Sequence, residues 1–335
     1  MDSIRVIPEI AQAHDGSLGM AYSYVKALKD AGAKEIKFQM HFADEESTKK
    51  DRFRKNIFPQ DIDRYSYWKR IEFSNKEWAE LINYCRQLKI NPIVSPFSYK
   101  AIDLCEKLDI KTLKIGSGEL NNEPLLIYAS QRCDEIVLST GMSTWNEIDK
   151  SIKILKKNID NIYVLQCTSK YPTNLSEIGI ENIVTIVNRY GVKSGLSDHS
   201  GKLSPSLAAA ACESTSMLET HVIFNKSCFG PDASSSILIS EFAMLKNFVE
   251  EIQLITNSKV DKSFVSPEIN NMKNLFGRSM VASVDILKGT KIEKNMIKYK
   301  KPGGGLTFAD EDKIIGKLSK RDILFDELIN EDDFK

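Results

Sequence analysis

The stretch 112–119, Thr-Leu-Lys-Ile-Gly-Ser-Gly-Glu, combines residue types that can hold an anion. An apolar run that is closed by glycines is typical of a buried strand entering a tight loop. Glycines let the backbone approach a ligand closely, and their N–H groups can bind an anion together with Ser117. A lysine in a buried strand is costly unless a partner neutralises it. Two interpretations of Lys114 therefore remain open, an anion pocket or a core lysine paired with Glu119.

Reactive side chains recur at the ends of other apolar runs along the chain. All four histidines fall at such places, and packing alone does not readily explain that placement. Functional groups at the carboxyl ends of barrel strands are typical of catalytic sites. The side chains concerned are Glu9, His14, Lys37, Gln39, His41, Ser95, Lys114, Glu119, Ser139, Tyr171, His199 and His221.

These side chains must be positioned by a regular alternation of strand-like and helix-like segments. Eight such pairs over about the first 255 residues predict an α/β chain with a (β/α)₈ TIM barrel, for which about 250 residues is usual. A doubly wound open sheet is the alternative, but no GxGxxG or Walker sequence follows the first strand or occurs elsewhere. The predicted strands are 6–10, 35–39, 92–97, 112–115, 135–141, 162–167, 192–196 and 216–219.

The alternation is interrupted by a long charged stretch, residues 41–75. It exceeds the usual connection length, which favours an excursion that covers the substrate. For any single one of its arginines and aromatic residues, a solvated surface with short helices is the favoured interpretation; these residues are Arg52, Arg54, Tyr65, Tyr67 and Trp68.

The C-terminal part has a different pattern. Residues 258–275 are polar and irregular and are interpreted as a linker between a barrel, residues 1–257, and a small β-rich domain, residues 276–335. Short strands with Gly and Pro turns indicate this second domain. A domain of this size has a small core, so we expect it to dock onto another surface.

Composition excludes several classes of protein. Lys+Arg and Asp+Glu both number 46 in 335 residues, so the zero net charge gives no support to a nucleic-acid or membrane-surface partner. No apolar run approaches the ~20 residues of a membrane span. No signal peptide is recognised, and the six cysteines lack CxxC spacing. Free thiols in a reducing, cytoplasmic setting are expected.

In combination and order, a set of motifs resembles the N-acetylneuraminate (sialic acid) synthase family over nearly the whole chain. The resemblance implies a phosphoenolpyruvate-binding (β/α)₈ barrel followed by an antifreeze-like (SAF, β-clip) domain. The motifs are Lys37-Phe38-Gln39, residues 114–119, 138–143, Gln166-Cys167-Thr168-Ser169 with Tyr171-Pro172, residues 195–199, Glu219-Thr220-His221, Gly230-Pro231-Asp232, residues 278–282 and Lys301-Pro302-Gly303.

The resemblance also implies a reaction and a cofactor. Phosphoenolpyruvate would condense with the open-chain aldehyde of a hexose derivative, releasing phosphate and forming a nonulosonic acid. His199 and His221 match the family's ligands of a divalent metal, Mn²⁺ foremost with Mg²⁺ or Co²⁺ as alternatives, and two imidazoles leave positions open for water and the aldehyde oxygen. A homodimer is implied in which each antifreeze-like domain caps the partner's barrel.

Further residues match the family's substrate contacts and active-site carboxylates. An anionic substrate needs ammonium and hydroxyl donors, which the phosphoenolpyruvate-side residues supply. The matches on that side are Lys37, Lys114, Ser95, Ser117, Ser139 and Ser197; the carboxylates are Glu9 and Glu119; and the remaining substrate contacts are Gln39, Ser169, Tyr171, Asp232 and Lys301.

The chain departs from the family pattern mainly on the sugar side. Ala11 and Ala13 replace a Gly and an Asn of the first motif, Ser169 stands in place of an Asn, and Ala233 in place of a His. Lys301 occupies the position of an arginine that reaches the sugar's N-acetyl group, and a lysine cannot form the same planar bidentate contact. We therefore expect N-acetylmannosamine to be a poorer substrate than a differently substituted hexose.

Two other functions are weighed against this one. A class I aldolase would form a Schiff base on Lys37 or Lys114, but flanking serines and two metal-suited histidines favour an anion pocket. A non-catalytic ice- or glycan-binding protein on a degenerate barrel would require lost metal ligands, and both histidines are present.

Overall fold

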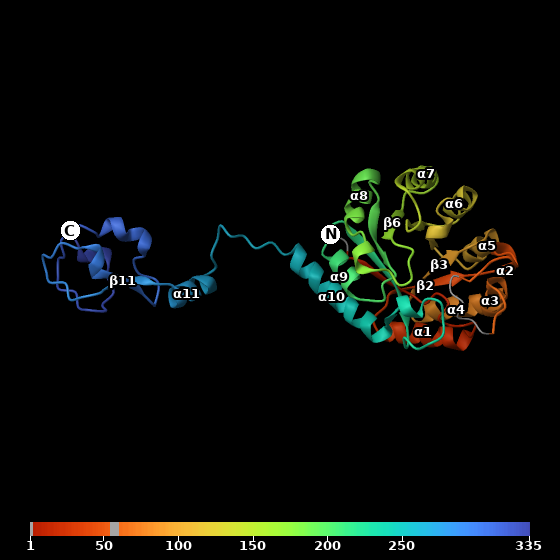
Figure 1. The fold of residues 1–335 in the computed structure, drawn as a ribbon, viewed down its shortest axis with the longest axis horizontal. Coiled ribbons are helices and arrows are strands. Elements are labelled where there is room, and N and C mark those ends of the chain that lie inside the picture. Colours follow the sequence, from red (N-terminus) through yellow and green to blue (C-terminus); the bar gives the residue numbers. More distant parts are fainter. Residues whose placement is uncertain (1–2, 54–59) are drawn as a thin grey trace. The chain divides into compact units, whose positions relative to one another are not determined.

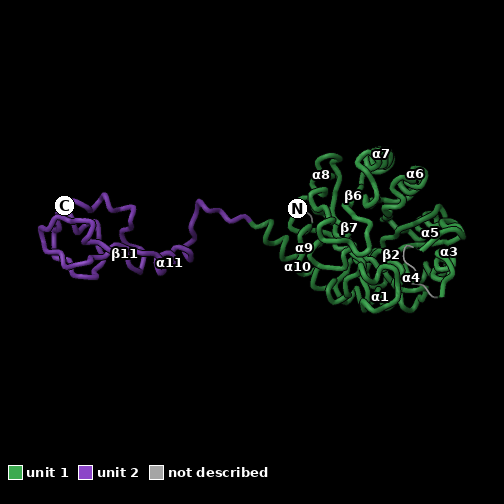
Figure 2. The backbone as a smooth tube through the Cα atoms, in the orientation of Figure 1, with its two compact units in different colours: residues 1–258 green, residues 259–335 purple. Residues whose placement is uncertain are grey.

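The computed structural model describes residues 3–53 and 60–335, and it divides after Ser258 into two compact units (Figure 2). The first unit is a closed parallel barrel. Its strands follow one another in sequence order from β1 to β8, and β1 pairs with β8 to close the ring. The barrel strands are β1 (Arg5–Glu9), β2 (Glu35–Met40), β3 (Asn91–Pro96), β4 (Thr112–Ile115), β5 (Glu135–Ser139), β6 (Ile162–Cys167), β7 (Lys193–Asp198) and β8 (Thr215–Ile223).

Helices surround this ring and bury their apolar faces against it (Figure 1). Their starts follow ordinary capping chemistry: Ser74 and Glu77 form a reciprocal capping box at the start of α4, with Ser74 N–H 2.8 Å from Glu77 Oε2. The helices of the first unit are α1 (Leu18–Asp30), α2 (Ala43–Glu46), α3 (Arg64–Ile71), α4 (Asn75–Gln87), α5 (Tyr99–Lys107), α6 (Glu123–Ser130), α7 (Trp145–Leu155), α8 (Glu181–Tyr190), α9 (Ser204–Ala210) and α10 (Ile239–Asn257).

The predicted TIM barrel is confirmed, and one strand differs from its expected bounds. The prediction ended the eighth strand at Glu219, whereas β8 continues through His221 to Ile223 and pairs there with the short strand β9 (Ile237–Leu238). His221 therefore lies within a strand and not in the loop after it. The apolar residues that follow it are the physical reason for the longer strand.

The barrel interior is layered beneath the strand ends. At the amino-terminal end Arg5 bonds Glu135 at 2.8 Å and Glu35 at 2.6 Å. Above this ion cluster lies a buried apolar layer that includes Ile7 and Met217, as is usual for side chains that fill a TIM barrel. The carboxyl-end layer above these two is polar, and it forms the candidate site.

One glycine is required for the barrel wall to close. An ideal Cβ at Gly195 on β7 would lie 1.8 Å from the carbonyl oxygen of Met217 on β8. The strand register shifts beside Gly195, and a side chain there would push the two strands apart. This glycine opens the motif that ends in Ser197, Asp198 and His199.

The second unit, residues 259–335, has its own isoleucine-rich core. Strands β10 (Ser279–Ala282) and β11 (Ile297–Lys300) form an antiparallel pair, and isolated bridges join the remaining segments. The irregular linker expected over residues 258–275 is wrong in its second half, because Pro267–Phe276 form helix α11. Ser266 caps this helix and proline occupies its first turn, a helix-start signal that the interpretation missed.

Candidate active site

The predicted site residues of the barrel meet in one cavity of about 530 Å³ at the carboxyl ends of the strands. Strand register brings them together, because Glu9 on β1 pairs with Lys37 on β2 on one side and with His221 on β8 on the other. The predicted residues that line the cavity are Glu9, Lys37, Gln39, Ser95, Lys114, Ser117, Glu119, Ser139, Ser169, Tyr171, Ser197, His199, His221 and Asp232. Lys301 belongs to the second unit.

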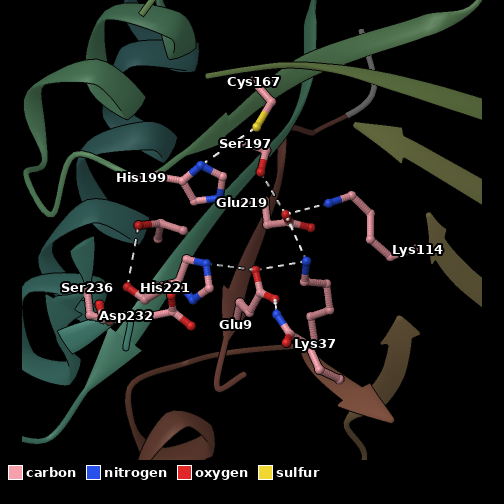
Figure 3. Close-up of polar contacts among 12 residues, drawn as sticks. Glu9, Lys37, Lys114, Cys167, Ser197, His199, Glu219, His221, Asp232 and Ser236 are labelled. Atoms are coloured by element: carbon pink, nitrogen blue, oxygen red, sulfur yellow. Dashed lines mark hydrogen bonds and ion pairs between the residues drawn. The ribbon is translucent and has the colours of Figure 1, made fainter. Parts of the chain in front are cut away.

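Two buried lysines share one carboxylate at the centre of this cavity. Nζ of Lys114 lies 2.7 Å and Nζ of Lys37 3.0 Å from Oε1 of Glu219, which also accepts a 2.8 Å hydrogen bond from Ser197 (Figure 3). The alternative pairing of Lys114 with Glu119 is wrong. Glu119 lies in the turn after β4 and accepts a hydrogen bond from Asn122. Glu219 was not among the predicted site residues.

Glu9 forms the second carboxylate of the cluster. Its Oε2 lies 2.8 Å from Lys37 Nζ and 3.4 Å from His221 Nε2, and its Oε1 accepts a 2.7 Å hydrogen bond from Gln39. Burial would raise the pKa of Glu9, but His221 and the two lysine ammonium groups outweigh burial and lower it. Glu9 is therefore ionised at neutral pH.

The same balance acts on the other three charges. Burial would raise the pKa of Glu219, but Lys114 and Lys37 outweigh burial and lower this pKa. For Lys37 the signs are reversed: burial would lower its pKa, but Glu219 and Glu9 raise it. Burial lowers the pKa of Lys114 overall, although Glu219 opposes this effect. Two lysines and two glutamates thus meet in one buried cluster before any ligand is bound.

Hydrogen-bond donors remain available around the two lysines. An ammonium carries three N–H donors, and the contacts of the described residues use two on Lys37 and one on Lys114. Within residues 3–53 and 60–335, Oγ of Ser139 is buried with no hydrogen-bond partner. Buried polar atoms are rarely left unpaired, so these groups are suited to an anionic ligand.

The loop after β5 is held tightly beside this site. The N–H of Gly141 donates a 3.0 Å hydrogen bond to Ser117 Oγ. A Cβ at Gly141 would lie 2.4 Å from Ser169 Oγ and 2.9 Å from Cys167 Sγ. A side chain at position 141 would therefore displace the side chains of Ser169, Cys167 and Ser117, which line the cavity.

His199 and His221 face the same side of the cavity (Figure 3), with ring centroids 5.3 Å apart. Nδ1 of His199 lies 3.1 Å from the Thr168 carbonyl oxygen and 3.7 Å from Cys167 Sγ. A backbone carbonyl on one ring nitrogen is the usual support of a metal-binding imidazole, because it leaves the other nitrogen free to coordinate. The pair therefore fits a divalent ion.

The pKa of His199 and the other side chains near the two histidines also bear on whether a divalent ion can bind there. Burial would lower the pKa of His199, but Cys167 and Thr168 raise it to about 9, so the groups around this ring favour a positive charge at its position. Asp232 also lines the cavity, in a loop held where Ser236 Oγ donates to the Asp232 carbonyl oxygen at 2.8 Å. In the described part of the chain no three His, Cys, Asp or Glu side chains gather as a metal site.

The long segment 41–75 contributes a wall of the cavity. Tyr67 and Trp68 on α3 are buried, and both line the cavity, as does His41. The excursion that the sequence predicts therefore reaches the site, and it does so through short helices. Arg54 lies outside the described residues.

His14 does not belong to the site, so its functional interpretation is wrong. Its ring lies 4.6 Å from the ring of Phe73, and its Nδ1 accepts a hydrogen bond from Gly16 N–H at 3.1 Å. The side chain is buried in packing contacts, and it is absent from the cavity lining.

We expect His14 to make the protein sensitive to acid. Burial and the neighbouring His41 lower the pKa of His14 from 6.5 to about 4. The unfolded chain binds the proton more tightly, so stability present above pH 6.5 is lost as the pH falls towards 4. The free energy of unfolding is measured in urea at pH 7 and at pH 4. Between these pH values it should fall by about 3 kcal/mol more in wild type than in His14→Asn. Equal dependence in both proteins would contradict this role.

Buried lysines, carboxylates and histidines at the carboxyl ends of closed parallel strands define a barrel enzyme. Residues 24–261 match the NeuB family and residues 277–335 match the SAF domain. The chain therefore belongs to the NeuB family, and its curated relatives are sialic-acid-type synthases, which are enzymes. No helix in residues 3–53 and 60–335 combines the length and apolar character needed to cross a membrane.

Individual relatives cover nearly the whole chain. The chain is 29% identical over 337 residues to N,N'-diacetyllegionaminic acid synthase of Campylobacter jejuni subsp. jejuni serotype O:2, covering 99% of this chain and 100% of that one. It is 30% identical over 338 residues to pseudaminic acid synthase of C. jejuni serotype O:23/36, covering 99% and 97%. The crystal structure of N-acetylneuraminic acid synthetase from Leptospira borgpetersenii with citrate matches with a TM-score of 0.70 and 26% identity, covering 81% and 91%.

Proposed function

We propose that this enzyme condenses phosphoenolpyruvate with the open-chain aldehyde of a hexose derivative and water, giving a nonulosonic acid and phosphate. The observation that carries the proposal is the contact of two buried lysines, Lys37 and Lys114, with one carboxylate. Their N–H donors are not all used by the described residues, and the nearby Ser139 hydroxyl has no hydrogen-bond partner among these residues. Such a set can bind a ligand that carries both a carboxylate and a phosphate. The relatives named as synthases of legionaminic and pseudaminic acid support the same reaction class.

The π pair of the C2=C3 bond of phosphoenolpyruvate forms the bond from C3 to the aldehyde carbon, and the aldehyde oxygen becomes a hydroxyl by taking one proton. The oxygen of water bonds to C2, the C2–O bond to phosphate breaks, phosphate leaves with the second proton of that water, and C2 becomes a carbonyl. Lys37 and Lys114 are proposed to bind the substrate's anionic groups, with Glu219 holding both ammonium groups at the carboxyl ends of β2 and β4. An ion cluster arranged before the substrate binds needs little reorganisation during reaction.

Glu9 is proposed to handle a proton of the attacking water or of the new hydroxyl. Its carboxylate is ionised and can accept a hydrogen bond from either group. Glu119 lines the same cavity and is the second carboxylate that the resemblance assigns. We propose that Ser169, Tyr171 and Asp232 contact the sugar.

His199 and His221 are proposed to hold a divalent ion, Mn²⁺ foremost with Mg²⁺ and Co²⁺ as alternatives. When bound there, such an ion supplies Lewis-acid polarisation of the aldehyde oxygen. The support for this site is the carbonyl contact that fixes the His199 ring and the proximity of the two imidazoles.

Phosphate release tests the proposal. Purified enzyme with Mn²⁺ and phosphoenolpyruvate should release phosphate only when a suitable sugar is added, and mass spectrometry should show the condensed acid. The panel comprises N-acetylmannosamine, mannose and 2,4-diacetamido-trideoxyhexoses. A Schiff-base aldolase would instead be trapped by borohydride with pyruvate. Trapping together with no sugar-dependent phosphate release would overturn the proposal.

Lys301 carries a prediction about the acceptor sugar. We propose, from the family resemblance, that it acts on the sugar of the partner subunit in a homodimer that exchanges its small domains. Wild type should use N-acetylmannosamine less well than a 2,4-diacetamido-trideoxyhexose, and Lys301→Arg should shift the ratio of kcat/KM values towards N-acetylmannosamine by about tenfold. Lys298→Arg is the matched control, because Lys298 is exposed on strand β11, which ends one residue before Lys301. A wild-type preference for N-acetylmannosamine that Lys301→Arg leaves unchanged would contradict this prediction.

A further inference from the structure

A histidine–carboxylate pair outside the lysine cluster lines the same cavity. The His41 ring lies between the rings of Trp68 and Phe97, with centroid distances of 4.0 and 4.5 Å and nearly parallel planes. Its Nδ1 lies 2.6 Å from Oε1 of Glu46, the last residue of α2. The imidazole is therefore fixed on both faces and at one edge, and it fixes the Glu46 carboxylate in turn.

The other oxygen of Glu46 has no partner in the described chain. The Glu46 side chain is only 8% exposed, and its Oε2 makes no hydrogen bond to any atom of residues 3–53 and 60–335. A buried polar oxygen without a partner is destabilising. Because Glu46 lines the cavity, a bound ligand is the natural source of the missing donor.

The acceptor chemistry of a carboxylate decides which ligand this can be. An ionised carboxylate only accepts hydrogen bonds, and it would repel the carboxylate and phosphate of phosphoenolpyruvate. The neutral acceptor sugar carries hydroxyl and acylamino groups, which are donors. The ligand that fits Glu46 is therefore the sugar.

A chain of contacts fixes the position of Glu46 relative to the reacting end. His41 Nε2 lies 3.1 Å from Gln39 Oε1, and Gln39 Nε2 donates to Glu9 Oε1 at 2.7 Å. Glu9 lies beside Lys37 and His221, where the aldehyde is proposed to react. His41 and Gln39 lie between Glu46 and Glu9 in this chain of contacts, so a sugar group that reached Glu46 would belong to the part remote from the aldehyde.

We propose that Glu46, oriented by His41, is a specificity-determining residue that accepts a hydrogen bond from an N–H or O–H group on the remote part of the acceptor sugar. This inference rests on the proposed function and assigns one of its sugar contacts.

The test pairs a change in the protein with a change in the sugar. Three sugars that differ at one remote carbon, bearing an acylamino group, a hydroxyl or hydrogen there, are compared in wild type, Glu46→Gln and Glu45→Gln. Glu45 lies beside Glu46 on α2 but is exposed, so it is the matched control. Sugar and phosphoenolpyruvate kinetics are measured separately for each variant.

Wild type and Glu45→Gln should reject the sugar that lacks the donor by about tenfold to a hundredfold in kcat/KM. Glu46→Gln should lose most of this discrimination while its KM for phosphoenolpyruvate stays within about twofold. If Glu46→Gln lowers kcat/KM more for the acylamino sugar, the donor is an N–H group. If it lowers kcat/KM more for the hydroxyl sugar, the donor is an O–H group.

Two results would overturn the inference, and only the second would also overturn the proposed function. Unchanged discrimination in a folded, active Glu46→Gln enzyme removes Glu46 from sugar recognition and leaves the proposed function intact. Absence of sugar-dependent phosphate release in wild type overturns the proposed function together with the inference. If Glu46→Gln does not fold, wild type alone still tests the role. Equal kcat/KM values of wild type for all three sugars would refute it.

Discussion

Replacing either His199 or His221 with alanine is expected to abolish turnover while the barrel stays folded. Both rings face the same part of the cavity, and neither belongs to the apolar layers that hold the strands together. Loss of a Lewis-acid site costs several kcal/mol of transition-state stabilisation, so the rate should fall about a thousandfold or more.

The measurement has a readout that does not depend on activity. Calorimetry should show Mn²⁺ binding to wild type and to His14→Asn, a histidine change outside the cavity lining, and no binding to either alanine variant. Circular dichroism and the thermal midpoint should show that all four proteins fold. Full turnover in either alanine variant, or in enzyme stripped by a chelator, would contradict the proposed metal site.

The barrel was predictable because its strands are buried on both faces. Such strands appear as continuous apolar runs, and β4 and β6 have the bounds that the sequence indicates. The prediction was wrong where the sequence signal was ambiguous or was not used. Polar residues hid the end of β8, and Ser266-Pro267 was interpreted as irregular chain although it begins α11.

The site was predictable in position and only partly in its pairings. Closure of a barrel brings polar strand ends together, so the lining residues could be named from sequence. The partner of Lys114 could not, because Glu219 is 105 residues away and pairing across a barrel leaves no local signal. One clue was available: Glu219 precedes His221 by two residues, and alternation along a strand places both side chains on one face.

His41 and Glu46 were missed as a pair for a related reason. His41 was recognised only as a strand-end histidine, and Glu46 stood within a charged stretch that favoured a solvated surface. Trp68, which covers the His41 ring, comes from α3 more than twenty residues later in the chain. A local reading of charge cannot show that a distant aromatic side chain will cover it.

Replacing Lys114 with methionine is expected to weaken phosphoenolpyruvate binding by about tenfold to a hundredfold. Methionine fills a similar volume but removes the ammonium and the two donors that the described contacts leave for the ligand. A charge-assisted hydrogen bond contributes about 1.5–3 kcal/mol, which gives this range. Calorimetry with phosphoenolpyruvate measures the change directly. Lys111→Met, an exposed lysine just before the same strand, is the matched control.

The same substitution should also destabilise the fold, and a second change separates the two effects. Removing Lys114 leaves the buried Glu219 with Lys37 and Ser197 as its partners among the described residues, and breaking a buried ion pair costs about 3 kcal/mol. Adding Glu219→Gln removes the uncompensated charge, so the double variant should recover stability to urea without recovering phosphoenolpyruvate affinity. Unchanged affinity in the single variant would contradict the anion pocket. Recovery of affinity in the double variant would show that Lys114 acts only by neutralising Glu219.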